Sequence, residues 1–211
     1  MIGLRQKLRL YLVTDPTLCR DYGLIRTVQD AVSGGVTMVQ LRAKEASTAE
    51  RVQMAVDLKA ALAGTGVPLV INDDVDAAIE ADVDGAHIGQ GDMAPEKARS
   101  LLGPGKILGL SCETIETVQA ADSDIIDYLG LGPVFGTATK TDHEAAIGFE
   151  GLERLVALTS LPTVAIGGLK SVHQARVLAS GANGQAVVSA ICRQPDPKAA
   201  AQKFMITEDL V

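Results

Sequence analysis

The sequence predicts a (β/α)8 TIM barrel with parallel strands, and three observations lead to this prediction. Short runs rich in aliphatic and β-branched residues alternate eight times with segments of helical periodicity along the 211 residues. Aromatic residues make up only 3% of the chain and Trp is absent, so the core is Val, Ile, Leu and Ala, as buried parallel strands require. No linker, low-complexity tract or charge block divides the chain, so residues 1–211 are expected to form a single domain.

The order of the elements follows from hydrophobic period and from Gly and Pro punctuation. The eight expected strands span residues 8–15, 37–42, 68–73, 85–90, 106–112, 128–134, 163–168 and 185–190. The eight expected helices span residues 24–33, 48–63, 75–81, 95–102, 115–121, 149–158, 171–179 and 197–204. A doubly wound open sheet is the alternative. Eight regular units, with no GxGxxG after the first strand, favour the barrel.

Capping residues support several of these helix starts. Ser47 and Glu50 have the spacing of a capping box at the second helix. Ser171 follows two glycines and is expected to cap the seventh helix. Asp74 and Asp92 are each also placed to cap the helix that follows them.

Composition limits the partners that the chain can have. A net charge of −7 disfavours nucleic-acid and membrane surfaces, which select for basic patches. No apolar run approaches the length of about 20 residues that spans a bilayer, and no signal peptide is visible, so a cytoplasmic protein is expected. Cys19, Cys112 and Cys192 are odd in number and far apart, which fits neither a zinc site nor a disulfide scaffold. Cys112 is expected to be a small buried hydrophobe.

Polar residues gather at the ends of the expected strands, where barrels of this kind carry their chemistry. The segment 132–140 after the sixth strand combines glycines with Thr137, Thr139 and Lys140. Its composition suits an anion and a lid that excludes water. A mobile polar surface loop is the alternative interpretation of this segment.

A basic pair ends the second strand. Arg42 and Lys44 lie two residues apart, and alternation places Gln40 on the same face as Arg42. An arginine fork with an ammonium group can clamp the oxygens of a diphosphate. Taken alone, the two cations would favour a solvated basic loop, and the polar residues at the other strand ends favour a function instead.

Two carboxylates end neighbouring strands. Asp73 ends the third strand, and Asp92 lies two residues beyond the fourth. Adjacent strand ends lie close together, and two carboxylates with water and phosphate oxygens make a good Mg²⁺ site. The alternative is that each aspartate caps a helix. His87 lies inside a strand and is expected to be a hydrogen-bonded core histidine rather than a catalytic base.

Small residues end the last two strands, at Gly167-Gly168 and at Val188-Ser189. Glycine lets a phosphate approach backbone N–H groups, and helix N-termini favour anions. Isolated glycines would serve turns equally well. As the paired ends of strands seven and eight they indicate a phosphate site.

These residues together resemble the thiamine-phosphate synthase family. The resemblance covers nearly the whole chain, in the order YLVTD (11–15), QLRAK (40–44), IND (71–73), HIGQ (87–90) with Asp92, GPVF (132–135), TK (139–140), AIGG (165–168) and VS (188–189). It implies a Mg²⁺-dependent transferase. The expected substrates are 4-amino-2-methyl-5-hydroxymethylpyrimidine diphosphate and 4-methyl-5-(2-phosphoethyl)thiazole or its carboxylated form. The products are thiamine phosphate and pyrophosphate, and the diphosphate leaves before the thiazole nitrogen attacks.

The resemblance also implies the residue roles. Those expected to act in catalysis are Arg42, Lys44, Lys140 and Ser111. Those expected to orient the pyrimidine and its diphosphate are Gln40, Asn72 and Ser111. Those expected to hold the thiazole phosphate and its ring are Thr137, Thr139, Gly168, Val188 and Ser189. Asp73 and Asp92 are the expected Mg²⁺ ligands. The sequence leaves open whether the chain forms a homo-oligomer.

Three positions depart from the family pattern, and two rival functions remain. Asp74 replaces a residue that is often basic or an amide, Gly91 a common acidic residue, and Glu113 a frequent histidine. Asp74 either tunes metal or diphosphate affinity or points away as a helix cap. A thiazole tautomerase or sugar-phosphate isomerase would need an acid/base residue at a strand end. A non-catalytic relative would be expected to lose Lys140 or one aspartate.

Overall fold

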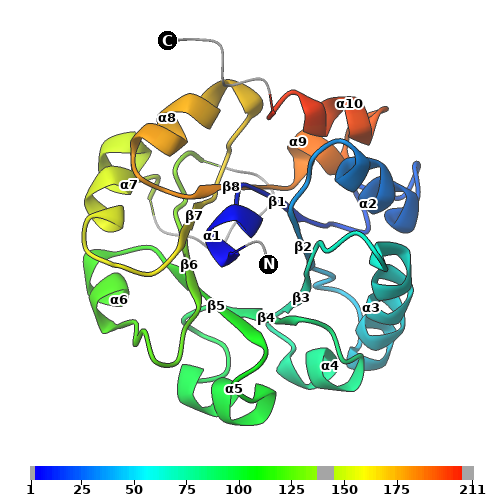
Figure 1. The fold of residues 1–211 in the computed structure, drawn as a ribbon, viewed down its shortest axis with the longest axis horizontal. Helices are drawn as coiled ribbons and strands as arrows, with labels where there is room; N and C mark the ends of the chain where they lie inside the picture. Colours follow the sequence, from blue (N-terminus) through cyan, green and yellow to red (C-terminus); the bar gives the residue numbers. More distant parts are fainter. Residues whose placement is uncertain (1–2, 137–144, 206–211) are drawn as a thin grey trace.

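The computed structural model describes residues 3–136 and 145–205, and these form a closed parallel barrel (Figure 1). The strands are β1 (Leu10–Val13), β2 (Met38–Leu41), β3 (Leu69–Asn72), β4 (Gly85–Ile88), β5 (Ile107–Cys112), β6 (Tyr128–Leu131), β7 (Thr163–Ala165) and β8 (Gly184–Val187). Each strand pairs with the next, and β8 pairs with β1 through Leu12 and Val187. The expected barrel is confirmed, and the open-sheet alternative is wrong.

Helices surround the barrel, as Figure 1 shows. They are α2 (Leu24–Ser33), α3 (Thr48–Leu62), α4 (Val75–Glu80), α5 (Pro95–Leu102), α6 (Ile115–Ala120), α7 (Gly148–Val156), α8 (Gln174–Ala179), α9 (Ser189–Cys192) and α10 (Pro197–Gln202). One face of the strands packs on these helices. The other face fills the barrel interior with Leu8, Tyr11, Val13, Met38, Val70, Tyr128, Val164 and Ala186. Burial on both faces explains why the strands are almost wholly apolar.

A short helix that the sequence did not predict, α1 (Leu4–Lys7), lies across the centre of the barrel in Figure 1. Its Leu4 packs against the interior cluster, and Arg5 donates to the carbonyl of Ser160 at 2.6 Å. The helix precedes β1 and so covers the amino ends of the strands. Four residues make about one helical turn, which is too short to show a period.

The ends of the last two strands differ from the prediction. β7 ends at Ala165 because Gly167 and Gly168 adopt left-handed backbone, with φ of 101° and 61°. β8 ends at Val187, and Val188 is the N-cap of α9. Ser189 therefore belongs to the first turn of a helix rather than to a strand.

The capping predictions have mixed outcomes. Ser47 and Glu50 form the expected capping box, and Asp74 caps α4 by accepting the N–H of Ala77 at 2.9 Å. Ser171 caps nothing: it lies inside the 3₁₀ turn η1 (Ser171–His173) that precedes α8. The N–H of Lys170 at that start is taken by the ring Nδ1 of His173 at 3.1 Å.

Asp92 is not the cap of α5 either. That helix starts at Pro95 after Ala94, and Asp92 instead accepts the backbone N–H of Gly89 at 2.7 Å. This bond folds the loop after β4 back on itself. The Asp92 carboxylate is thereby kept near the strand end, where the metal prediction needs it.

Candidate active site at the carboxyl end of the barrel

A cavity of about 1360 Å³ occupies the carboxyl end of the barrel. Of the predicted site residues, those that line it are Gln40, Arg42, Lys44, Asn72, Asp73, Asp92, Ser111, Gly168, Val188 and Ser189. They come from the ends of β2, β3, β5, β7 and β8 and from the loop after β4. Thr137, Thr139 and Lys140 lie outside the described residues. The fold thus brings together every predicted site residue that it describes.

A chain of buried hydrogen bonds forms the floor of this cavity. Gln40 Nε2 donates to the Tyr11 hydroxyl at 2.7 Å, which lies 2.8 Å from the Tyr128 hydroxyl. Nδ1 of His87 lies 2.9 Å from the Tyr128 hydroxyl, and Nε2 of His87 lies 2.9 Å from Ser111 Oγ. His87 is therefore a hydrogen-bonded core histidine, as predicted. The chain fixes the side chains of Gln40 and Ser111 from below.

Burial keeps the two phenols of this chain neutral. It is the main cause that raises the pKa of Tyr11, against the lowering effect of its hydrogen bonds to Tyr128 and Gln40. Burial likewise raises the pKa of Tyr128, and the neighbouring Tyr11 adds to the effect. A neutral hydroxyl can donate one hydrogen bond and accept another, so the chain connects its members without placing a charge beneath the cavity.

The two predicted metal ligands lie side by side. Burial, followed by the adjoining Asp92 side chain, raises the pKa of Asp73 to about 6, while the side chains of Asn72 and Arg42 act in the opposite direction. Two carboxyl groups in this position resist ionising together unless a cation lies between them. The pair therefore fits a hard divalent ion such as Mg²⁺.

The rest of the ligand shell must come from elsewhere. Within residues 3–136 and 145–205, no group of three or more His, Cys, Asp or Glu side chains converges as a metal site. Mg²⁺ usually keeps several waters and is held by one or two carboxylates with substrate phosphates. An acidic pair beside the cationic Arg42 matches that type of site.

The glycines after β7 have an internal role that the sequence did not reveal. A Cβ on Gly167 would lie 2.6 Å from Pro133 Cα, and one on Gly168 would lie 2.8 Å from Phe135 Cβ. The carbonyl of Gly167 also accepts the N–H of Phe135 at 3.1 Å. These glycines therefore let the loop after β7 pack against the loop after β6. Contact of Gly168 with a phosphate stays a prediction.

Sequence reasoning assigned no role to several residues that line the cavity: Tyr11, Gln90, Lys170 and Arg193. Gln90 donates to the Ser111 carbonyl at 2.7 Å and so steadies the end of β5. Only Tyr11 carried a usable signal, since a tyrosine within an apolar strand needs a partner for its hydroxyl. Arg193 and Lys170 lie in loops whose course depends on where β8 and β7 end.

The structure also places Cys112 and the three residues expected to depart from the family pattern, Asp74, Gly91 and Glu113. Asp74 points away from the large cavity, caps α4 and pairs with Arg51, which favours the cap interpretation. Gly91 and Glu113 both line the cavity. Cys112 is buried as expected, and burial raises the pKa of its thiol to about 11. The thiol is therefore a poor nucleophile.

Comparison with known proteins decides the family. The family described as thiamine monophosphate synthase matches residues 10–191. The chain belongs to the thiamine-phosphate synthase family. A thiamine-phosphate synthase of Psychrobacter sp. is 54% identical, with 92% of each chain covered. One of Vibrio parahaemolyticus is 48% identical, over 95% of this chain and 98% of the other.

A solved structure agrees with this assignment. The thiamine phosphate pyrophosphorylase from Pyrococcus furiosus superposes with a TM-score of 0.87 at 34% identity, covering 96% of both chains. Membership of the thiamine-phosphate synthase family confirms the resemblance seen in the sequence, together with the barrel fold and the transferase activity. In the described part of the chain, no helix is long and apolar enough to cross a membrane.

Proposed function

We propose that the large cavity binds the pyrimidine diphosphate and the thiazole phosphate together and there forms thiamine phosphate and pyrophosphate. One observation carries this proposal: residues from widely separated strand ends line a single cavity, with a carboxylate pair beside an arginine. The volume of about 1360 Å³ leaves room for two substrates in contact. Family membership supplies the reaction.

The cations serve the leaving group in this proposal. Arg42, Lys44 and Lys140 neutralise the charge that grows on the diphosphate as its bond to the pyrimidine methylene breaks. Lys44 lies at the rim of the cavity, and the charge of Arg42 already acts on Asp73. Because the diphosphate departs before the new bond forms, charge on the leaving group matters more than activation of the nucleophile.

Asp73 and Asp92 would hold the Mg²⁺ of this reaction. When bound, the ion supplies Lewis-acid stabilisation of the diphosphate oxygens. The support for this role is the position of the two carboxylates side by side in the large cavity, beside Arg42. The family's general dependence on Mg²⁺ is in agreement.

The organic parts of the substrates would be held by the remaining residues. Gln40, Ser111 and Asn72 orient the pyrimidine and diphosphate, and the hydrogen-bond chain below Gln40 and Ser111 supports this role. Thr137, Thr139, Gly168, Val188 and Ser189 hold the thiazole phosphate and ring. A neutral thiazole nitrogen needs no general base. The two ring nitrogens of His87 are accordingly engaged with Tyr128 and Ser111.

The proposal extends to the setting of the protein. The three cysteines are unpaired and buried, which suits a reducing cytoplasm. No nucleic-acid or membrane partner is proposed for this acidic chain.

The activity assay tests the function. Purified protein with Mg²⁺ and both substrates should release pyrophosphate and form thiamine phosphate, measured by chromatography and a coupled pyrophosphate assay. A chelator should stop the reaction, and added Mg²⁺ should restore it. A folded sample that forms no product from fresh substrates would sink the proposal.

Two variants test the assigned roles. Asp92→Asn and Lys140→Ala should each lower kcat by about 100-fold or more, since removal of one preorganised charge stabiliser typically has this effect. Asp57→Asn is the matched control, because Asp57 is exposed on α3 and lines no part of the site. Equal rates in all three variants would remove the metal and leaving-group roles.

A further inference from the structure

Two loops carry the diphosphate end of the proposed site. The loop after β2 bears Arg42 and Lys44, and the loop after β3 begins with Asp73. The strand register between β2 and β3 runs only to Leu41 and Ile71. Lys44 and Asp73 therefore lie beyond the strand pairing. Asp73 is still tied to β4, because its N–H donates to the carbonyl of His87 at 2.8 Å, whereas no strand pairing reaches Lys44. Contacts between the two loops therefore help to set their relative position.

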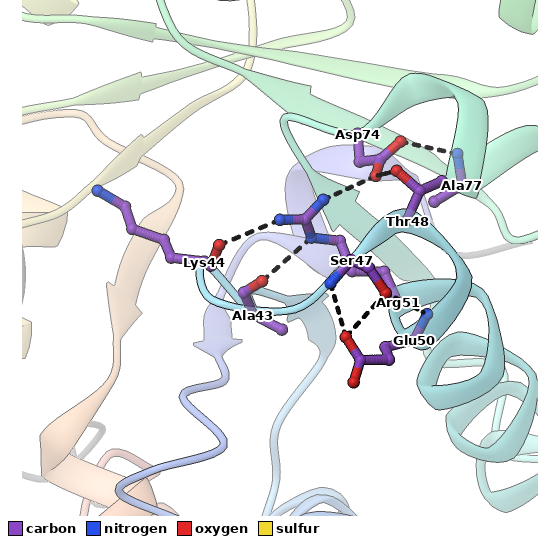
Figure 2. Close-up of polar contacts among 8 residues, drawn as sticks. All are labelled: Ala43, Lys44, Ser47, Thr48, Glu50, Arg51, Asp74 and Ala77. Atoms are coloured by element: carbon purple, nitrogen blue, oxygen red, sulfur yellow. Dashed lines mark hydrogen bonds and ion pairs between the residues drawn. The ribbon is translucent and has the colours of Figure 1, made fainter.

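Arg51, in the first turns of α3, joins the two loops (Figure 2). Its Nε donates to the carbonyl of Ala43 at 3.0 Å, and its Nη2 donates to the carbonyl of Lys44 at 3.2 Å. Its Nη1 donates to Asp74 Oδ2 at 2.8 Å. One guanidinium thus holds two successive carbonyls of one loop and a carboxylate of the next. Its rigid fork of donors suits this task.

The carboxylate of Asp74 is equally committed. Oδ2 also accepts the hydroxyl of Thr48 at 2.9 Å, and Oδ1 accepts the N–H of Ala77 at 2.9 Å. The side chains of Arg51 and Asp74 are only 20% and 12% exposed, so water screens the pair weakly.

The pair does not belong to the substrate cavity. Arg51 and Asp74 are absent from the lining of the 1360 Å³ cavity and border an adjoining cavity of about 520 Å³, which shares Lys44, Asn72 and Asp73 with it. Figure 2 shows the Lys44 side chain extending away from the Arg51 guanidinium, whose bond to Lys44 is made to the backbone carbonyl. The bonds of Arg51 to this loop are made to backbone carbonyls, so Arg51 acts on Lys44 through the backbone of the loop.

We propose that Arg51 and Asp74 are positioning residues that lock the Lys44 loop against the Asp73 loop. The pair fixes the distance between a cation for the diphosphate and a carboxylate for Mg²⁺. This inference rests on the proposed function for the roles of Lys44 and Asp73. It also gives a use to Asp74, at which the chain departs from the family pattern.

The chain offers a matched control at the opposite end of the barrel. Arg99 donates to Asp127 Oδ2 at 2.6 Å and to the carbonyls of Ile125, Gly103 and Lys106. Arg99 therefore makes the same kind of clamp, but at the amino ends of β5 and β6. A variant there removes comparable bonds without touching either loop of the site.

The test compares Arg51→Met, Asp74→Asn, the double variant and Arg99→Met. We expect Arg51→Met to lower kcat/KM for the pyrimidine diphosphate by about 10-fold to 100-fold, as misplacement of reacting groups does. The KM for the thiazole phosphate should change less than about twofold, and the double variant should be no worse than Arg51→Met, because the residues act as one unit. Arg99→Met should lose thermal stability without this selective effect.

A binding experiment keeps the inference separate from the activity. Calorimetry with inorganic pyrophosphate and Mg²⁺ should show affinity at least about tenfold weaker for Arg51→Met than for Arg99→Met, with folding checked by circular dichroism. Arg51→Lys, which retains the charge but not the fork, replaces Arg51→Met if the latter does not fold. Equal pyrophosphate affinities in the Arg51 and Arg99 variants would overturn the positioning role. Wild-type protein that forms no thiamine phosphate would overturn the proposed function instead.

Discussion

Tyr128 is the residue on which the floor of the site depends. Its hydroxyl lies 2.8 Å from that of Tyr11 and 2.9 Å from Nδ1 of His87, and both tyrosines are almost completely buried. Solvent therefore has little access to these groups, and a lost partner is hard to replace. Hydrogen bonds in such a chain also strengthen one another in a low-dielectric interior.

Tyr128→Phe should therefore destabilise the protein. The change keeps the ring but leaves the Tyr11 hydroxyl and His87 Nδ1 short of a partner, which should lower the free energy of unfolding by about 1–3 kcal/mol. Urea unfolding followed by circular dichroism measures the difference. Tyr22→Phe is the control: Tyr22 bonds Asp30 near the surface, and its loss should change stability by less than about 0.5 kcal/mol. Similar losses of unfolding free energy in both variants would show that the buried hydrogen bonds of Tyr128 do not contribute specially to stability.

At the scale of single residues, sequence reasoning found the strand-end residues because period places them. Arg42 and Asp73 directly follow mostly apolar runs, and Ser111 lies near the end of one. Sequence reasoning did not predict the Tyr11–Tyr128–His87 hydrogen-bond chain, because this chain joins β1, β6 and β4 across the barrel interior. A hydrogen bond between distant strands depends on which side chains meet in the interior, and no local pattern contains that information.

At the scale of elements, the helix caps show how far the local sequence can predict where a helix starts. Ser47 and Glu50 satisfy each other's backbone groups with bonds between residues only three apart, so the sequence alone was sufficient. Ser171 is also a serine and follows two glycines, but the 3₁₀ turn already includes it. Lys170 is the N-cap of that turn, and its N–H donates to Nδ1 of His173. Which side chain bonds a free N–H at a helix start therefore depends on which of several nearby groups reaches it.

The two serines give a prediction by contrast. Ser47→Ala should lower the free energy of unfolding by about 1 kcal/mol, since it removes the cap of the 15-residue helix α3. Ser171→Ala should leave stability within about 0.5 kcal/mol of wild type, because it caps no helix. Paired urea titrations measure both values. A larger loss at Ser171 than at Ser47 would reverse the assignment.

The ends of β7 and β8 also belong to this scale. The run Val187-Val188 favours a longer strand by composition. The strand nevertheless ends at Val187, where its pairing with Leu12 of β1 ends. Closure of the barrel therefore sets the length of its last strand, and the position of Ser189 at the start of α9 follows from it.

The two ends of the barrel have different features. The carboxyl end holds the cavity, whereas the amino end holds α1 and ion pairs that join successive units. Asp82, before β4, accepts Lys106 at 2.6 Å and Lys59 at 3.0 Å. These bonds tie α3, the turn after α4 and the start of β5. That residues 1–211 form one domain stays a prediction.

This ion-pair group predicts a pH dependence of stability. Lys106, and then Lys59, lower the pKa of Asp82 to about 2. In the unfolded chain the carboxyl returns to about 3.9. Because the pKa is lower in the folded state, the stabilisation is present above about pH 4 and is lost as the pH falls towards about 2.

Asp82→Asn tests this dependence. Asp82 has a φ of 48°, a left-handed conformation that Asn also tolerates, so the change removes charge with little backbone strain. Between about pH 4.5 and 2.5 in low salt, the unfolding free energy of wild type should fall more steeply than that of Asp82→Asn. Urea titrations at several pH values measure the slopes. Equal slopes would show that the two lysines do not stabilise the fold through this carboxylate.

The sequence by itself determined the eight-fold alternation, the apolar parallel strands and the type of residue at each strand end. These features are local: period, capping and turn chemistry act over a few residues. Only the tertiary structure decided that the Tyr11–Tyr128–His87 chain links Gln40 to Ser111 and that Arg51 clamps two loops. Each of these contacts joins different strands or loops, so it exists only once the barrel has closed.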